Sequence, residues 1–466
     1  MKRELIRQLM ERLWAKYEYA SILMNDARGK RYSVSGQGVS CAMSKMLSEC
    51  GYVIKAYDGR YFCEYSFGEL REDNIDRIVS AVDDVFAARE QAEKAGFQSV
   101  AYAKPEEKEL VSFTENEMHQ NPDECSDEII VDRLRRIREH AMSLDKRIFD
   151  CRTDAQYQIY SKYFLSPARE LSQKLLWMTG SYFMMAKKGE IIKSYYKAYS
   201  NRDGMAVLDK MDDGISVTVK GALELLDACT IKPGEYDCIC TPEVTGMIVH
   251  EAFGHGVEMD MFVKDRALAK DYIGERVASG LVTMHDGAKS AVEVASYEFD
   301  DEGVSGKDTV IIDKGILKSG ICDYQSAITL GVEPTGNGRR ESYERKAYTR
   351  MTNTFFEGGS DSLEDMIASV KYGFILENAT CGMEDPKNWG IQCMVNMARE
   401  ISDGKLTGKI FSPIVLSGYV PDLLKSISMM SPREELCGSG FCGKGCKEWV
   451  KVSDGGPYIK AKIRLG

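Results

Sequence analysis

Apolar and polar positions over the first hundred residues alternate between the spacing of helices and that of strands. Apolar residues recur at helical intervals over residues 5–14 and again over residues 75–86, with charged residues between them. Residues 51–67 instead form two alternating runs around Asp58-Gly59. An Asp-Gly pair between two such runs predicts a β-hairpin, because glycine readily adopts the positive φ of the turn.

Less regular segments lie between these elements. Residues 19–36 predict two strands around a turn at residues 27–29, and residues 41–49 predict a helix. Residues 104–127 are acidic and polar and contain two prolines, which predicts a linker. The helix predicted after it carries a basic face. Its interleaved apolar residues favour a solvated helix face over a nucleic-acid patch for Arg133, Arg135, Arg136 and Arg138.

Strand patterns dominate from about residue 156. A helix predicted over residues 204–227 interrupts them, and three further hairpins are predicted at the glycine-containing pairs Lys188-Gly189, Lys314-Gly315 and Asp403-Gly404. The pattern predicts an α+β fold, with an N-terminal α/β domain over residues 1–230 and a C-terminal domain rich in antiparallel β-sheet over residues 231–466.

Composition narrows the class of protein. The chain has 466 residues, of which 44% are hydrophobic, enough for several cores. Its 61 basic and 72 acidic residues give a net charge of −11, which disfavours a nucleic-acid binder. No run of about 18 apolar residues occurs, so we expect no membrane span. The 14 cysteines are scattered and the amphipathic start is not typical of a signal peptide, so we expect reduced thiols in the cytoplasm.

The segment CTPEVTGMIVHEAFGHGVEMD holds two of the five histidines. Thr241 and Pro242 suit the start of a helix, which carries His250 and Glu251 near its far end. The motif is H-E-x-x-x-H, whereas the H-E-x-x-H of zinc peptidases puts both histidines on one helix face. His250 and His255 would lie about 140° apart on a regular helix. They can share a metal only if the helix is irregular, for example with a π-type turn.

We therefore predict that this helix, in the C-terminal domain, is not regular through Gly254–His255, where glycines make a distortion inexpensive. The alternative is that both histidines are ordinary polar residues at a frayed helix end. A zinc hydrolase also needs a third protein ligand and an open position for water. Thiolate candidates follow near the C-terminus, and spacing alone leaves open whether they are ligands or free thiols: Cys437, Cys442 and Cys446.

A second cluster covers residues 333–359, where basic and aromatic residues alternate between glycines. Glu341 and Glu344, between its basic residues, argue against an RNA-binding surface. A loop that binds an anionic or peptide-carboxylate group fits better, and a purely structural loop fits equally well. The substrate-binding candidates are Arg340, Tyr343 and Tyr348.

Three separated motifs, HEAFGHGVEMD, GNGRRESYERKAYTRMTNTFFEGG and FCGKGC, resemble those of the TldD/PmbA family of metallopeptidases, as does GYVIKAYDGRYFCEYSF near the N-terminus. The chain is similar to the branch that carries H-E-x-x-x-H. The resemblance implies zinc bound by His250, His255 and Cys442, with Glu251 as general base. It also implies an N-terminal α/β domain, a C-terminal antiparallel domain and a dimer. Phe441 and the tail after Trp449 depart from the family pattern.

Our hypothesis is a zinc-dependent peptidase of small or unfolded peptides. The resemblance implies a homodimer, or a heterodimer with a paralogue that lacks the motif, and neither nucleic acid nor a membrane is expected as a partner. One alternative is a non-catalytic regulatory or maturation partner with a structural zinc, whose fourth ligand would be Glu258, Asp260 or Cys446. The other alternative is a zinc hydrolase of a non-peptide amide.

Overall fold

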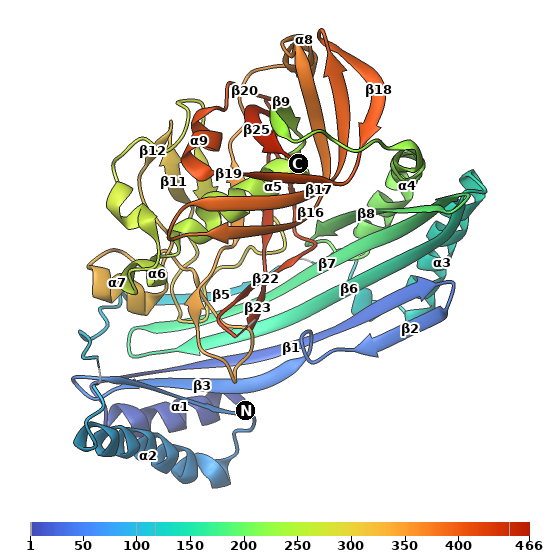
Figure 1. Cartoon of the computed structure of the whole chain (residues 1–466). Helices are drawn as coiled ribbons and strands as arrows, with labels where there is room; N and C mark the ends of the chain where they lie inside the picture. The colour runs from blue at the N-terminus through green and yellow to red at the C-terminus, as the bar shows by residue number, and fades with distance from the viewer. Residues whose placement is uncertain (1, 99, 117, 447) are drawn as a thin grey trace.

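A long, twisted sheet forms the base of the molecule (Figure 1). The computed structural model describes residues 2–98, 100–116, 118–446 and 448–466. Eight described strands make up this sheet in the order β4-β3-β1-β6-β7-β5, with β2 paired to β1 and β8 to β7. Their bounds are β1 (Tyr19–Ser35), β2 (Gly38–Met43), β3 (Glu49–Tyr57), β4 (Phe62–Phe67), β5 (Leu110–Glu115), β6 (Ile148–Leu165), β7 (Arg169–Lys188) and β8 (Ile191–Asn201).

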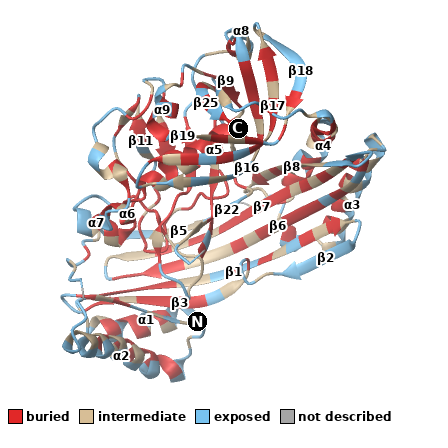
Figure 2. Ribbon diagram, viewed as in Figure 1, coloured by how far each residue is buried: buried red, intermediate tan, exposed pale blue. Residues whose placement is uncertain are grey.

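Four helices cover one face of this sheet. Alternate residues of a strand point to opposite faces, so Ile22 and Leu23 of β1 face different partners. Ile22 packs in the core that α1 and α2 share with the sheet, and the corresponding face further along the strands packs against α3 and α4. Leu23 and Phe164 pack instead against Phe299 of the C-terminal half. The sheet is thus buried on both faces over much of its length (Figure 2), between the C-terminal half and α1 (Lys2–Trp14), α2 (Ile75–Lys94), α3 (Asp127–Leu144) and α4 (Ala206–Glu224).

The C-terminal half contains two larger sheets. The first has the order β16-β9-β25-β19-β17-β18, with β20 on β25, and β16 also pairs with β17. The second has the order β12-β11-β10-β15-β24-β21. The first sheet consists of β9 (Gly234–Cys240), β16 (Tyr372–Asp385), β17 (Gly390–Ser402), β18 (Lys405–Phe411), β19 (Ile414–Tyr419), β20 (Met429–Met430) and β25 (Ile459–Leu465). The second consists of β10 (Met284–Asp286), β11 (Thr309–Asp313), β12 (Ile316–Leu317), β15 (Asn353–Phe356), β21 (Glu435–Cys437) and β24 (Ser453–Gly456).

Short elements complete this half. Two two-stranded ribbons are β13 (Gly338–Arg339) with β14 (Tyr348–Thr349), and β22 (Phe441–Lys444) with β23 (Glu448–Lys451). The α-helices are α5 (Pro242–Val249), α6 (Met259–Val263), α7 (Tyr324–Leu330), α8 (Leu363–Ala368) and α9 (Val420–Lys425). Most pairings of described strands in this half are antiparallel, and β9–β16 and β15–β24 are parallel. The architecture is α+β, as the sequence predicts.

All four predicted glycine hairpins are confirmed. Asp58-Gly59 lies between β3 and β4, and the other three glycines turn β7 into β8, β11 into β12, and β17 into β18. Each turn glycine has a positive φ: Gly59, Gly189, Gly315 and Gly404. The helices predicted over residues 5–14, 75–86 and 204–227 and after residue 127 are also confirmed.

Three predictions in the N-terminal half are wrong. Residues 19–36 do not turn at residues 27–29, because β1 runs straight through them. Gly29 instead allows β1 and β6 to approach closely, since a Cβ there would lie 2.1 Å from the carbonyl oxygen of Tyr157 in β6. Residues 41–49 are not helical but contain the end of β2 and the start of β3. The expected linker over residues 104–127 contains β5, which pairs in parallel with β7.

We propose the predicted division near residue 230 as a domain boundary, because each sheet of described strands takes its strands from one side of it. Within the described part of the chain, no helix combines the length and the apolar character needed to cross a membrane.

Candidate metal centre

The H-E-x-x-x-H segment begins on a helix that packs directly on a strand. Thr241 stands at the N-cap and Pro242 in the first turn of α5, as predicted, although the Thr241 hydroxyl makes no capping hydrogen bond. Gly246 brings the helix onto β24, because a Cβ there would lie 2.7 Å from the amide nitrogen of Gly455. The next residue back along β24, Asp454, is thereby placed beside His250.

The helix then widens, as the spacing of the histidines predicts. Residues His250–Gly254 form a π-helical turn, and His255–Val257 form a 3-10 turn. The predicted irregularity through Gly254–His255 is therefore confirmed. Gly254 permits tight packing here, since a Cβ would lie 2.2 Å from the sulfur of Met351. The result brings the two imidazole rings together, with centroids 5.0 Å apart and ring planes at 83°.

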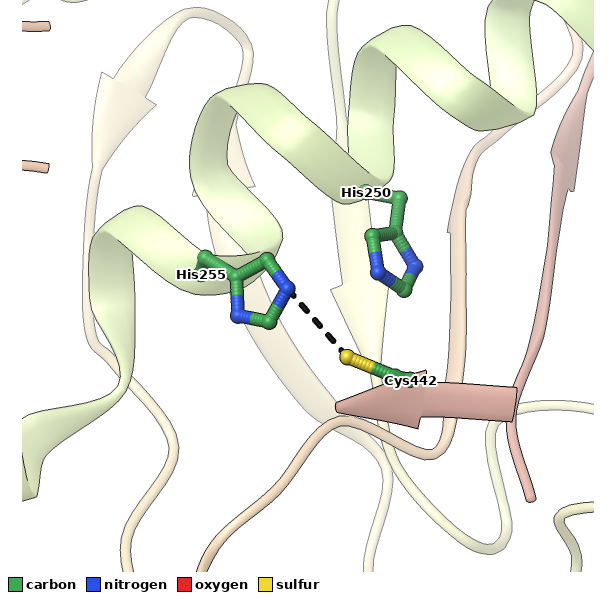
Figure 3. Close-up of side chains that lie close together, drawn as sticks. All are labelled: His250, His255 and Cys442. Atoms are coloured by element: carbon green, nitrogen blue, oxygen red, sulfur yellow. Dashed lines mark hydrogen bonds between the residues drawn. The ribbon is translucent and has the colours of Figure 1, made fainter. Parts of the chain in front are cut away.

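Cys442 approaches these histidines from the ribbon β22–β23 (Figure 3). Its sulfur lies 3.2 Å from Nε2 of His255. One ligand atom from each of His250, His255 and Cys442 lies within 4.8 Å of the others. Cys437 instead contacts the carbonyl oxygen of Ala198 at 3.7 Å, and Cys446 is exposed. The structure thus brings together the three residues that the resemblance selected.

The charges of the three residues are coupled in the metal-free protein. Burial raises the pKa of Cys442, but the neighbouring imidazoles of His255 and His250 outweigh it and bring the pKa down to about 5. Burial lowers the pKa of His255, but Glu258 and Cys442 outweigh it and raise the pKa to about 10. A thiolate beside two imidazoles is a donor set that suits zinc, and three protein ligands leave one position for substrate or water.

A carboxylate lies behind each imidazole. Nδ1 of His255 lies 3.1 Å from Oε2 of Glu258, and Nδ1 of His250 lies 3.5 Å from Oδ2 of Asp454, a long ionic contact rather than a hydrogen bond. Burial opposes ionisation of Glu258, yet Lys444 and His255 lower its pKa to about 2. Such carboxylates orient histidine ligands and fix which ring nitrogen faces a metal.

Glu251 points toward the hairpin β16–β17. Its side chain lies against Gly382, where a Cβ would come within 2.4 Å of the Glu251 Cγ. Carboxylate oxygens of Glu251 and Glu384 and a ring nitrogen of His255 lie within 4.8 Å of one another. Burial raises the pKa of Glu251 to about 7, with Glu384 adding to the shift and His250 opposing it. A carboxylate with this pKa can accept a proton near neutral pH.

The hairpin that carries Glu384 is anchored to the histidine motif. Trp389 at its turn is 2% exposed and lies with its ring 5.6 Å from that of Phe253 and 4.5 Å from that of Tyr272. Sequence reasoning missed Glu384 and Gly382, because nothing in their local sequence links them to the motif. It also missed Arg350, which is fully buried and donates hydrogen bonds to the carbonyl oxygens of Cys442 and Glu448.

The three substrate-binding candidates lie around the second cluster. The Arg340 side chain is 5% exposed and pairs with Glu64 of β4, and the ring of Tyr343 packs against Gly51 of β3. Tyr348 lies beside Gly445, in the turn between β22 and β23. Their role in substrate binding stays a prediction. His285 of β10 is not among the proposed ligands, and its two ring nitrogens lie 2.8 Å from Asp308 and 2.9 Å from Glu357.

Comparison with known proteins identifies the family. The model of the PmbA/TldA metallopeptidase C-terminal domain matches residues 233–464. A zinc metalloprotease TldD homolog from Saccharolobus solfataricus is 31% identical over 314 residues, which cover 66% of this chain and 69% of that protein. A metalloprotease of Methanocaldococcus jannaschii is 37% identical over 239 residues, 51% of this chain and 52% of that protein. The chain spans about half the length of several of the curated relatives it matches.

Solved structures share the fold over the whole chain. TldE from Thermococcus kodakarensis has a TM-score of 0.77 at 18% identity and covers 99% of this chain and 100% of its own. A Thermotoga maritima protein has a TM-score of 0.78 at 16% identity, with the same coverage of both chains. These identities establish the fold alone. The family model and the relative from Saccharolobus solfataricus show that the chain belongs to the PmbA/TldD family of metallopeptidases.

Proposed function

We propose that the chain is a zinc-dependent peptidase that hydrolyses small or unfolded peptides. The observation that carries this proposal is the convergence of His250, His255 and Cys442 beside the carboxylate of Glu251. The name of the Saccharolobus solfataricus relative, a zinc metalloprotease, supports the choice of metal.

The donor atoms fit the proposed ion. Two imidazole nitrogens and one thiolate sulfur are typical zinc ligands, and the π-helical turn supplies the geometry that a regular helix would deny them. Zinc held by these residues supplies a Lewis acid, which lowers the pKa of water and polarises a carbonyl group.

Glu251 performs the proton transfers in this proposal. Its carboxylate takes a proton from the attacking water and delivers it to the leaving amine. A pKa of about 7 matches both steps, because the group must first gain and then lose a proton near neutral pH. Gly382 leaves room for the Glu251 side chain against β16. Glu384 helps to raise the pKa of Glu251.

The edge of β16 offers a place for an extended peptide. β16 pairs with β17 as far as Asp385, but its pairing with β9 covers only Gly373–Leu376. Beyond Leu376, no described strand pairs with the edge of β16 opposite β17. This unpaired part of β16 contains Gly382 and Glu384, which lie beside Glu251. Strand addition binds main-chain atoms and would give weak sequence preference. The proposed side-chain contacts to substrate are Arg340, Tyr343 and Tyr348, of which Arg340 must first leave its buried ion pair with Glu64.

The arrangement favours this function over a purely structural zinc site. A closed site needs a fourth protein ligand. Both carboxylates considered for that role, Glu258 and Asp260, are bonded to Lys444 Nζ, and Cys446 is exposed. We further propose a dimer, formed with a second copy or with a paralogue that lacks the motif, which light scattering of the purified chain with and without that paralogue will measure.

The test is digestion of a mixture of unfolded peptides by the purified chain, alone and with the paralogue, followed by mass spectrometry. We expect cleavage that a chelator abolishes and zinc restores. Parallel incubation with non-peptide amides separates a peptidase from a general amidase. Stoichiometric zinc binding without cleavage of any peptide would contradict the proposed function.

A further inference from the structure

One buried carboxylate connects the imidazole of His255 to the strand that carries Cys442. Glu258 follows His255 by three residues and is 2% exposed. Its Oε2 lies 3.1 Å from Nδ1 of His255, within hydrogen-bond distance. A histidine that binds a metal is neutral and carries one N–H. With that N–H on Nδ1 facing Glu258, Nε2 is the ring nitrogen left for a metal beside the Cys442 sulfur.

Lys444 completes the connection from the other side. It follows Cys442 by two residues in β22, and alternate residues of a strand share a face. Its ammonium group donates to Oε2 of Glu258 at 3.0 Å, to Oδ1 of Asp260 at 2.6 Å and to the carbonyl oxygen of Thr349 at 3.0 Å. The Lys444 side chain is 12% exposed, so the ion pair is largely shielded from water.

The same strand face thus presents a thiol to one side of His255 and a cation to the carboxylate behind it. We propose that Glu258 and Lys444 form a positioning pair that orients His255 and holds strand β22 at the distance at which Cys442 shares a metal with it. This inference rests on the proposed metal site, and it goes beyond that site by assigning two residues that touch neither metal nor substrate. A buried carboxylate that lost its cation would no longer be held in place behind His255, and the imidazole that it orients would be misplaced as a ligand.

The test compares zinc affinity in the folded, metal-free protein for Glu258→Gln, Lys444→Met and the control Lys264→Met. Lys264 also pairs with Asp260, at 3.1 Å, but its side chain is 44% exposed, and the ion pairs of Glu258 among the described residues are with His255 and Lys444. Competition with a chromophoric chelator gives the zinc Kd, and cobalt substitution gives a thiolate-to-metal absorption band. Circular dichroism and thermal unfolding of the metal-free variants report the fold separately.

We expect Glu258→Gln and Lys444→Met each to raise the zinc Kd by about 10- to 100-fold and to weaken the cobalt–thiolate band. The control should stay within about threefold of the wild type. The zinc Kd of the double variant should be no higher than that of the weaker-binding single variant, because both substitutions break the same connection between His255 and β22. If Lys444→Met does not fold, Lys444→Gln keeps a donor without the charge and is expected to weaken binding in the same direction.

Folded variants that bind zinc within about threefold of the wild type would overturn the inference, even if their unfolding temperatures fall, since that pattern describes a purely structural ion pair. A wild type that binds zinc but cleaves no peptide would overturn the proposed function and leave this inference standing. A wild type that binds no zinc would overturn both.

Discussion

The sulfur of Cys442 lies 3.2 Å from Nε2 of His255, across 187 positions of the chain. This contact singles out one of three cysteines in a short glycine-rich segment. Cys442→Ser is therefore expected to weaken zinc binding by at least about 100-fold, since loss of a ligand costs no less than loss of its outer partner. Cys437→Ser and Cys446→Ser are matched controls and should keep the wild-type zinc stoichiometry, measured by elemental analysis after dialysis. Equal zinc loss in all three variants would exclude Cys442 as the specific ligand.

Gly382 leaves no room for a side chain beside Glu251. A Cβ at Gly382 would lie 2.4 Å from the Glu251 Cγ, so Gly382→Ala must displace the proposed base. We expect peptide hydrolysis to fall by about 100-fold, the cost of a misplacement of about 1 Å, while zinc stays bound. Gly418→Ala in strand β19 of the same sheet is the control, because a Cβ there meets nothing within 4 Å. Initial rates at matched zinc content measure the effect, and equal rates for both variants would argue against a role for this contact.

Zinc affinity should rise with pH. In the metal-free protein Glu258 and Cys442 raise the pKa of His255 to about 10 against the opposing effect of burial, so His255 holds a proton at pH 7 that zinc must displace. Cys442, with a pKa of about 5, is already a thiolate. For each proton that zinc displaces, we expect the zinc affinity to rise about tenfold per pH unit between pH 6 and pH 9. Calorimetry in buffers of different ionisation enthalpy counts the protons, and a pH-independent affinity would show that His255 binds zinc without losing one.

Ion pairs between the N-terminal sheet and the C-terminal half stabilise their packing. Lys55 of β3 pairs with Glu302 at 2.7 Å, with side chains 13% and 4% exposed. Lys55→Met leaves a buried carboxylate without its cation and should lower the free energy of unfolding by about 3–5 kcal/mol. Lys2→Met, whose pair with Asp26 is 56% and 50% exposed, should change it by less than about 0.5 kcal/mol. Urea denaturation measures the free energy of unfolding of both variants. Similar unfolding midpoints for Lys55→Met and Lys2→Met would refute the predicted difference in stability.

How much of this molecule could be predicted from its sequence depends on the range of the interaction concerned. The hairpin at Asp58-Gly59 follows from local turn chemistry, and the irregular helix follows from the spacing of His250 and His255. Gly29 looks identical to a turn glycine, yet its role is a contact with Tyr157 in a distant strand, which no local pattern encodes.

The same distinction applies to the candidate site. The histidines and Glu251 are recognisable because they are adjacent in sequence, whereas Cys442 was singled out only by family resemblance. Glu384 and Lys444 reach the site through strand pairing and through the packing of β22 against the motif, so their places became visible only in the folded chain.

The most direct test of the central claim is peptide hydrolysis by Glu251→Gln loaded with one zinc per chain, beside the wild type at the same loading. The substitution keeps the size of the side chain and removes the proton acceptor. The account predicts unchanged zinc content and a rate lower by about 10²- to 10⁴-fold. Hydrolysis at the wild-type rate by the zinc-loaded variant would contradict it.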